Sequence, residues 1–449
     1  MRIEQPRFRI AVRRPLWLAL SLLLVGALRS PAEEPASPRL GALRKAIGAG
    51  ESGGLEQFWR KVAEEGTPLV EPIEGSKEEV LVTYLWRGGD ETKNVLVVIT
   101  PNDLATAEGI AWARLARLPA TDLWYFSRRM RSDARFAYSL SVNDSLAPLA
   151  QATPAEEEAR WNALIADPKN PRSALDPQAS LAELPGAPPQ PWIVPHPENP
   201  AGRLEDRNLK SALLGNERLV RVYTPPGYDP KSAPYPLAVI LDGRTYTAEI
   251  PTQTILDNLL AAGKIPPLVA VFVSNPSAES RLGEFTCNPK FAEFLSQELI
   301  PWVRKDWHVT TDPARTAIAG SSLGGLAAAC AAVSSPQIFG NVLSISGAFY
   351  WQIAGDAEPE GVAHRMAFGP KLPLRFYLEA GLMEDRQRPG NPSLLTANRH
   401  LRDVLQAKGY TVDYQEFNGG HSVLNWRGSI ADELQALFSR TSRRDRAAP

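Results

Sequence analysis

The stretch Thr316-Ala-Ile-Ala-Gly-Ser-Ser322-Leu-Gly-Gly-Leu-Ala-Ala-Ala-Cys330-Ala-Ala decides how this chain is expected to fold. It begins as an apolar run typical of a buried strand and passes through the turn Gly320-Ser321-Ser322-Leu323-Gly324. It then continues as an alanine-rich run that favours a helix. Because glycine lets the backbone turn sharply, the stretch predicts a strand, a tight turn and a helix in succession.

Further strand-like and helix-like runs alternate on both sides of this stretch. Strands are expected at residues 218–223, 235–242, 268–273, 316–320, 341–346 and 374–378, and helices at 252–262, 289–305, 323–334, 393–408 and 429–439. Most of the strand runs lack polar alternation, as strands buried on both faces do. The alternation therefore predicts the α/β class, with a mostly parallel sheet covered by helices on both faces.

The chain of 449 residues exceeds the ~250–300 residues that one hydrophobic core usually supports, so two domains are expected. Two short helices (40–65) and the strand-like runs 80–86, 95–99, 123–126 and 136–140 predict an N-terminal antiparallel β-sandwich. Ten prolines between residues 167 and 200 disfavour helices and central strands and predict an extended connector. The expected limits are 40–166 for the sandwich domain, 167–204 for the connector and 205–441 for the α/β domain.

The N-terminus has the layout of a signal peptide. Arg9, Arg13 and Arg14 precede an apolar run of 14 residues (15–28), and small residues follow through Ala32. The run is shorter than the ~20 residues of a membrane-spanning helix. We therefore expect residues 1–32 to direct export, to the periplasm, with cleavage near residues 30–32. An uncleaved N-terminal anchor is the alternative.

Composition excludes several classes of partner and cofactor. Lys and Arg (49) nearly balance Asp and Glu (50) without long runs of one sign, which argues against a nucleic-acid partner and favours a small molecule. The two cysteines, Cys287 and Cys330, lack metal-binding spacing, so neither a metal nor another cofactor is expected. A disulfide between them is possible but is not expected, because Cys330 falls in a predicted buried helix, where cysteine acts as a small apolar side chain.

The G-x-S-x-G turn carries chemical meaning through its setting. Alone the motif is weak, but between a strand and a helix it matches the nucleophile elbow of α/β-hydrolases, with Ser322 as the nucleophile. A serine hydroxyl needs a base to take its proton. Among the five histidines, His421 has the expected place, after the run 412–417 and the loop Asn418-Gly-Gly. The others lie in the connector (His196), before the serine (His308), in an expected loop insertion (His364) and in an expected helix (His400).

An acid and an oxyanion site complete the expected constellation. The acid should follow the run 374–381, where Glu384 is favoured over its neighbour Asp385, with Asp403 as a more distant alternative. Two backbone N–H groups should bind the developing oxyanion. One is expected from Leu323 and the other from Gly243 or Arg244.

Several short motifs resemble the enterochelin (enterobactin) esterase family, whose members cleave ester bonds in catecholate trilactone siderophores. They are Leu241-Asp-Gly-Arg244, Arg281-Leu-Gly-Glu-Phe285, Cys287-Asn-Pro-Lys-Phe291, the Ser322 elbow, Ser346-Gly with Tyr350-Trp351, Leu378-Glu-Ala-Gly with Glu384, and Gly419-Gly-His421 with Asn425-Trp-Arg-Gly428. Upstream, residues 82–87 and 167–171, with Leu184-Pro and Gln190-Pro-Trp192, are similar to the N-terminal sandwich and connector of that family.

The resemblance implies roles for particular side chains. Ser322 and His421 are the implied working pair, and Glu384 stands at the acid position. Arg244 and Arg281 are implied to hold an anionic catecholate–iron complex, and Trp351 is placed with them as a substrate-binding residue. For Arg281, an ion pair with Glu284 is an equally weighted alternative.

The expected activity is therefore that of a serine esterase which cleaves a catecholate siderophore through an acyl-enzyme. The signal peptide departs from the cytoplasmic branch of the family and favours a periplasmic hydrolase. Two alternatives remain open at this point. One is an exported esterase acting on acetylated or feruloylated carbohydrate, and the other is a siderophore-binding protein without catalysis.

Overall fold

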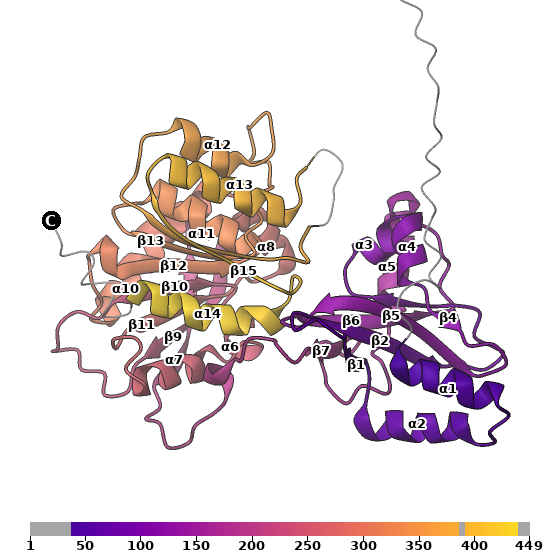
Figure 1. Ribbon diagram of the computed structural model, residues 1–449. Coiled ribbons are helices and arrows are strands. Elements are labelled where there is room, and N and C mark those ends of the chain that lie inside the picture. The colour runs from indigo at the N-terminus through magenta and orange to yellow at the C-terminus, as the bar shows by residue number, and fades with distance from the viewer. Residues whose placement is uncertain (1–36, 386–390, 439–449) are drawn as a thin grey trace, which may run out of the picture.

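The computed structural model describes residues 37–385 and 391–438, which form two parts joined by the proline-rich segment (Figure 1). The larger, C-terminal part is an α/β structure built on one eight-stranded sheet. The N-terminal part contains two small antiparallel sheets. The predicted fold class is thus confirmed.

The large sheet has the strand order β15-β14-β13-β12-β10-β11-β9-β8. The strands are β8 (Arg203–Ser211), β9 (Asn216–Thr224), β10 (Leu237–Leu241), β11 (Val269–Val273), β12 (Thr316–Ser321), β13 (Asn341–Ile345), β14 (Arg375–Gly381) and β15 (Thr411–Phe417). Strands β15 to β11 in this order pair in parallel, whereas β9 and β8 pair antiparallel at one edge. The carboxyl ends of the parallel strands therefore meet at one edge of the sheet.

Helices cover both faces of this sheet, because its central strands are apolar on both sides. In β10, Val239 belongs to one buried apolar cluster and Ile240 to the other. The helices are α6 (Thr245–Ala248), α7 (Thr252–Ala261), α8 (Ala278–Phe285), α9 (Pro289–Glu293), α10 (Ile300–Asp306), α11 (Leu323–Ser334), α12 (Gly361–Phe368), α13 (Leu394–Ala407) and α14 (Val423–Phe438). Side chains of α8 to α13 join the first cluster, and those of α6, α7 and α14 join the second. The expected helix 289–305 is split, because a π-helical stretch (Phe294–Leu299) separates α9 from α10.

The N-terminal part is a sandwich of the sheets β1-β2-β5-β4 and β3-β6-β7. Its strands are β1 (Leu69–Pro72), β2 (Glu79–Arg87), β3 (Val95–Val98), β4 (Ala116–Arg117), β5 (Leu123–Arg131), β6 (Arg135–Val142) and β7 (Ser180–Glu183), and its helices are α1 (Pro38–Gly48), α2 (Gly54–Glu65), α3 (Asn102–Ala105), α4 (Ala107–Ala113) and α5 (Pro154–Asn162). One buried cluster joins Tyr84 and Phe126 of the first sheet to Phe136 and Tyr138 of the second. This shared core makes the two sheets one unit.

The proline-rich segment is not purely an extended connector. Within it, β7 pairs with β6 and completes the second sheet of the sandwich. The prolines flank Ser180–Glu183 but do not interrupt it, so its N–H groups remain free to pair. The expected domain limits themselves stay predictions.

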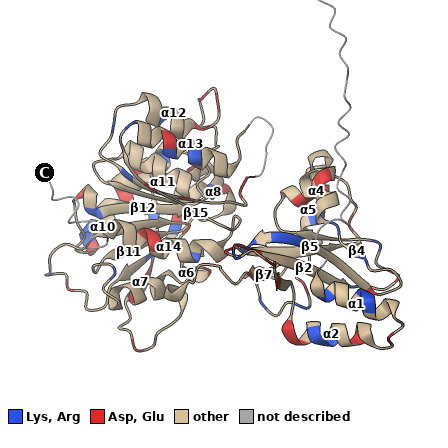
Figure 2. Cartoon of the chain, viewed as in Figure 1, with Lys and Arg blue, Asp and Glu red and all other residues tan. Residues whose placement is uncertain are grey.

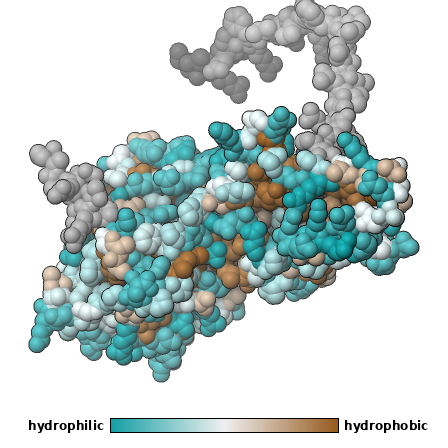
Figure 3. Space-filling model, turned by 60° about the horizontal axis from the view of Figure 1, so that its bottom comes forward, coloured by the Kyte–Doolittle hydropathy of each residue, from teal (hydrophilic) through white to brown (hydrophobic). Residues whose placement is uncertain are grey.

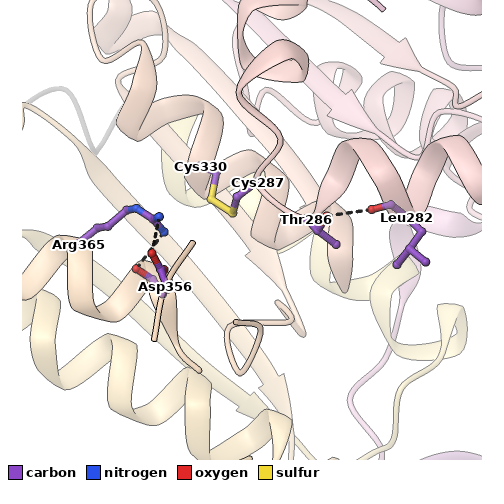
Figure 4. The surroundings of a disulfide bond; sticks show 7 residues. Leu282, Thr286, Cys287, Cys330, Asp356 and Arg365 are labelled. Carbon is purple, nitrogen blue, oxygen red and sulfur yellow. Dashed lines mark hydrogen bonds and ion pairs between the residues drawn. A yellow bond between two sulfur atoms is a disulfide. The ribbon is translucent and has the colours of Figure 1, made fainter. Parts of the chain in front are cut away.

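Cys287 and Cys330 form a disulfide, so the expectation of two free thiols is wrong (Figure 4). Cys330 lies on α11, and Cys287 lies between α8 and α9, which both pack against α11. Cys287 also has a left-handed backbone conformation, with φ 62°. The bridge depends on this packing, which the separation of 43 residues along the chain does not reveal.

Acidic and basic residues are interspersed along both parts of the protein (Figure 2). The face shown in Figure 3 is mainly hydrophilic, with small separate apolar areas. No helix in the described ranges 37–385 and 391–438 is both long and apolar enough to cross a bilayer. The expected signal peptide, residues 1–32, lies outside these ranges.

Candidate active site

Ser322 lies on the sharp turn between β12 and α11. Its backbone has φ 57° and ψ −123°, a conformation that side-chain-bearing residues rarely adopt. Its N–H donates to the carbonyl of Ile345 (3.0 Å), and its carbonyl accepts from the N–H of Ala348 (3.0 Å). The end of β13 and the loop after it therefore hold the turn. Ser322 is half-buried while Ser321 is buried, so only the predicted nucleophile is presented outward.

The glycines at the start of the turn and directly after it are required by close packing. A Cβ atom on Gly320 would lie 2.5 Å from the carbonyl carbon of Gly324, and one on Gly325 would lie 2.3 Å from the hydroxyl of Ser344. These separations are too short for a carbon atom. The motif thus allows α11 to start directly against the sheet.

Glu384 and His421 meet at the carboxyl ends of β14 and β15. His421 Nδ1 lies 2.7 Å from Glu384 Oε1. The second carboxylate oxygen of Glu384 accepts from the N–H of Gly381 (2.7 Å). The Glu384 side chain is 2% exposed and the His421 side chain 42% exposed, so a buried carboxylate faces an accessible imidazole. Asp385 is exposed, and the geometry favours Glu384 of the two neighbours.

Trp426 links the His421 side of the site to the Ser322 side. Its ring packs edge-on against His421, with ring centroids 4.9 Å apart. Its indole N–H donates to the hydroxyl of Ser346 (3.2 Å), the residue after Ile345, which holds the Ser322 turn. The sequence motifs included Ser346 and Trp426, but this contact depends on α14 lying across the sheet and was not predicted.

The prediction that Gly243 could donate its N–H to the oxyanion is wrong. Its N–H donates to the carbonyl of Val273 in β11 (2.9 Å) and is therefore engaged. Leu323 begins α11, where helix N–H groups carry a partial positive charge. Arg244 directly precedes α6 after β10, with an exposed side chain. Leu323 and Arg244 therefore remain the candidate oxyanion donors.

Arg281 does not pair with Glu284. Its guanidinium donates two hydrogen bonds to Asp242, of 2.6 and 2.7 Å, at the end of β10. Glu284 instead binds the buried guanidinium of Arg218 at 2.8 and 3.0 Å. The ion-pair alternative named the wrong partner. The Arg281 side chain is still 32% exposed, so part of it can face a ligand.

Trp351 lies in the loop after β13, three residues beyond Ala348, which bonds Ser322. It is half-buried beside Tyr350, with ring centroids 6.3 Å apart. Trp351 therefore lies in the same loop as Ala348, which holds the Ser322 turn.

The remaining candidates have other partners. His196 lies beside Glu198 and His400 beside Glu360, whereas Asp403 pairs with Arg402. His364 lies in α12, not in a loop, because residues 361–368 form a regular helix. The described residues include no group of three potential metal ligands.

The arrangement is suited to acyl transfer. A serine on a strained turn, a histidine held by a buried carboxylate and N–H groups at helix starts are the parts that this chemistry needs. A profile of the putative esterases matches residues 211–437, and a profile of the N-terminal part of enterochelin esterases matches residues 81–193. The chain belongs to the enterochelin esterase family. Its C-terminal part is the esterase domain of that family.

Individual enterochelin esterases match this chain over both parts. The iron(III) enterobactin esterase of Dickeya dadantii is 33% identical, over 86% of this chain and 93% of its own length. The ferric enterobactin esterase structure from Salmonella typhimurium has a TM-score of 0.69 at 30% identity and covers 85% of this chain and 98% of its own. The Shigella flexneri enterobactin esterase, solved in the presence of enterobactin, has a TM-score of 0.66 at 29% identity, with 85% and 97% covered.

Proposed function

We propose that this protein hydrolyses the ester bonds of a catecholate siderophore of the enterobactin type, through an acyl-enzyme on Ser322. The observation that carries the proposal is the pairing of His421 with the buried Glu384, at the same edge of the sheet as the Ser322 elbow. The matches to enterobactin esterases across both parts support the substrate class.

The reaction follows from this arrangement. The Ser322 oxygen attacks the ester carbonyl while His421 Nε2 takes the hydroxyl proton, and Nδ1 stays bonded to Glu384. Backbone N–H groups of Leu323 and Arg244 stabilise the oxyanion. His421 then gives the proton to the departing alcohol, leaving the acyl group on Ser322. Water, activated by His421, releases the carboxylic acid and restores the serine.

The charges beside the site suit an anionic substrate. Arg244 has an exposed side chain, and Arg281 has a partly exposed one. Ferric tris-catecholate carries net negative charge, which such guanidinium groups attract. Trp351 adds an aromatic surface for a catechol ring.

The two alternatives receive less support. An esterase acting on carbohydrate would not account for the match of residues 81–193 to the N-terminal part of enterochelin esterases. A binding protein without catalysis would not need the strained Ser322 or the paired His421 and Glu384.

The periplasm is the proposed location, because residues 1–32 have the layout of an export signal. Fractionation of producing cells, combined with N-terminal sequencing, tests this point. A mature chain beginning near residues 30–33 in the periplasmic fraction is expected. A full-length chain in the cytoplasm would contradict it.

Mass spectrometry of reaction products tests the substrate. The protein is incubated separately with ferric enterobactin, iron-free enterobactin and a feruloylated sugar, and the Ser322→Ala variant is the control. Linear dihydroxybenzoyl-serine products from wild type alone are expected. Release of ferulate without siderophore cleavage would overturn the substrate class.

A further inference from the structure

The loop that carries His421 is bound by the N-terminal sandwich. The carbonyl of Asn418, three residues before His421, accepts from the N–H of Arg135 (3.0 Å). The amide side chain of Asn418 donates to Asp133 Oδ1 (2.7 Å). Asp133 lies in the turn between β5 and β6, and Arg135 begins β6. One residue of the loop is therefore fixed to the sandwich through both its backbone and its side chain.

A second anchor lies beyond His421, in the first turn of α14. The buried side chain of Asn425 donates to the carbonyl of Arg135 (3.2 Å) and to the carbonyl of Gly420 (3.4 Å). Arg135 thus binds the chain on both sides of His421, through its N–H before the histidine and its carbonyl after it. Figure 1 shows this junction, where α14 meets the sandwich beside β6.

The contact between loop and sandwich leaves no free space. A Cβ atom on Gly419 would lie 2.3 Å from the side-chain nitrogen of Asn425 and 2.6 Å from the carbonyl oxygen of Arg135. Gly419 is therefore needed for the close approach of the two parts. Any larger side chain would push the loop away from the sandwich.

The sandwich side of this contact is itself firmly held. The Arg135 side chain is 5% exposed and bonds Glu183 of β7 and the carbonyl of Pro188. Because the Glu183 side chain and the carbonyl of Pro188 hold the Arg135 side chain, the backbone N–H and carbonyl of Arg135 are held in place against the loop.

The same loop also contacts the segment that bears Glu384. The carbonyl of Gly419 accepts from the N–H of Met383 (3.0 Å), the residue before Glu384. The side chain of Met383 packs against the apolar core of the sandwich. The N-terminal part therefore contacts the segments that bear both His421 and Glu384.

We propose that the N-terminal sandwich is a structural part of the catalytic centre, with Asp133, Arg135, Asn418 and Asn425 as positioning residues for His421. The proposal rests on the proposed serine-esterase function. The sandwich then serves the chemical step for every ester, in addition to any part in recognising the siderophore. Displacement of a catalytic group by about 1 Å can cost about 100-fold in rate, so small shifts of this loop matter.

A small ester separates positioning from substrate recognition, because p-nitrophenyl acetate has no catechol or iron for the sandwich to bind. Asn418→Ala and Asp133→Ala are expected to lower kcat for this ester about 10-fold with little change in KM. Gly419→Ala is expected to lower it about 100-fold. Labelling of Ser322 by a fluorophosphonate, which also requires the activated serine, should slow by the same factors.

Three further variants make the test specific. In the double variant Asp133→Ala/Asn418→Ala, kcat should fall no further than in either single variant, because the two side chains act through one hydrogen bond. Asp133→Asn keeps an oxygen that can accept from Asn418 and should restore most of kcat. Asn199→Ala removes a hydrogen bond between the proline-rich segment and Asn258 of α7 without touching the loop, and should leave kcat unchanged.

Unchanged kcat and labelling rate in Asn418→Ala and Gly419→Ala, with loss confined to the siderophore, would overturn the proposal. Independent, additive losses at Asp133 and Asn418 would overturn it as well. Wild type that cleaves the small ester but no siderophore would overturn only the substrate assignment. Thermal unfolding midpoints of the Asp133 and Asn418 variants, expected to stay close to wild type, show that their loss of kcat does not come from unfolding. For Gly419→Ala, where the added Cβ displaces the loop, an unchanged circular dichroism spectrum at the assay temperature serves the same purpose.

Discussion

Glu384 Oε1 lies 2.7 Å from His421 Nδ1, although the two residues stand 37 positions apart in the chain. Neighbouring parallel strands, β14 and β15, bring them to the same edge of the sheet. Both oxygens of the buried carboxylate are engaged, one by the imidazole and one by the N–H of Gly381. The carboxylate is thus held to orient the ring and to stabilise its charge when it takes the serine proton.

Substitution of each of the two neighbouring carboxylates should show which one is the catalytic acid residue. Glu384→Gln should lower kcat at least about 100-fold, because the amide cannot stabilise the charged imidazole that forms during the reaction. Asp385→Asn, at an exposed side chain, should stay within about twofold of wild type. Steady-state kinetics on a small ester measures both. The opposite ranking would assign the acid to Asp385.

Removal of the Cys287–Cys330 disulfide should weaken the fold and leave the chemistry intact. The double variant Cys287→Ser/Cys330→Ser should lose about 2–4 kcal/mol of unfolding free energy, because the unfolded chain gains freedom over the closed loop. Its kcat should match that of wild type. Denaturant unfolding measures the first effect. Two titratable thiols in the native wild-type protein would contradict the bridge.

Glu379 of β14 should make stability depend on pH. Burial raises the pKa of Glu379 from 4.5 to about 7, and the nearby carboxylates of Asp432 and Glu384 add to the rise. The folded-state pKa is the higher one, so the folded state favours protonated Glu379. The stability that this protonation provides is complete below about pH 4.5 and is lost as the pH rises through about 7. The shift corresponds to about 3 kcal/mol as an upper bound.

The variant Glu379→Gln removes this titration. From pH 5 to pH 8, wild type loses stability at this residue and the variant does not. The unfolding free energy of the variant should therefore rise relative to that of wild type by up to about 3 kcal/mol. Chemical unfolding of both proteins at the two pH values measures the difference. Parallel pH dependence in the two proteins would show that Glu379 does not titrate in this range.

The sequence predicts the parts of this protein that local patterns determine. The apolar run before Ser322 and the alanine-rich run after it predict a strand and a helix. His421 was chosen because it follows the run 412–417, where the α/β-hydrolase order places the base. These predictions depend on residues close in the chain. The sequence favoured Glu384 but kept Asp385 as an alternative, because burial and the contact with His421, which distinguish the two adjacent carboxylates, are not visible in the sequence.

Other features depend on contacts between distant segments and were missed or assigned wrongly. The engagement of the Gly243 N–H depends on β11, and the partner of Arg281 depends on how α8 lies against the end of β10. The disulfide depends on the packing of α11 against its neighbours. The hydrogen bonds that Asp133 and Arg135 make with Asn418 and Asn425 join residues more than 280 positions apart, which no local pattern can reveal.

The most direct test of the account is the reaction of Ser322 itself. Intact-protein mass spectrometry after fluorophosphonate treatment, together with turnover of the siderophore ester, is measured for wild type and for Ser322→Ala. We predict one adduct and full turnover for wild type, and neither adduct nor turnover for a variant with an unchanged circular dichroism spectrum. Turnover by Ser322→Ala at the wild-type rate would contradict the account.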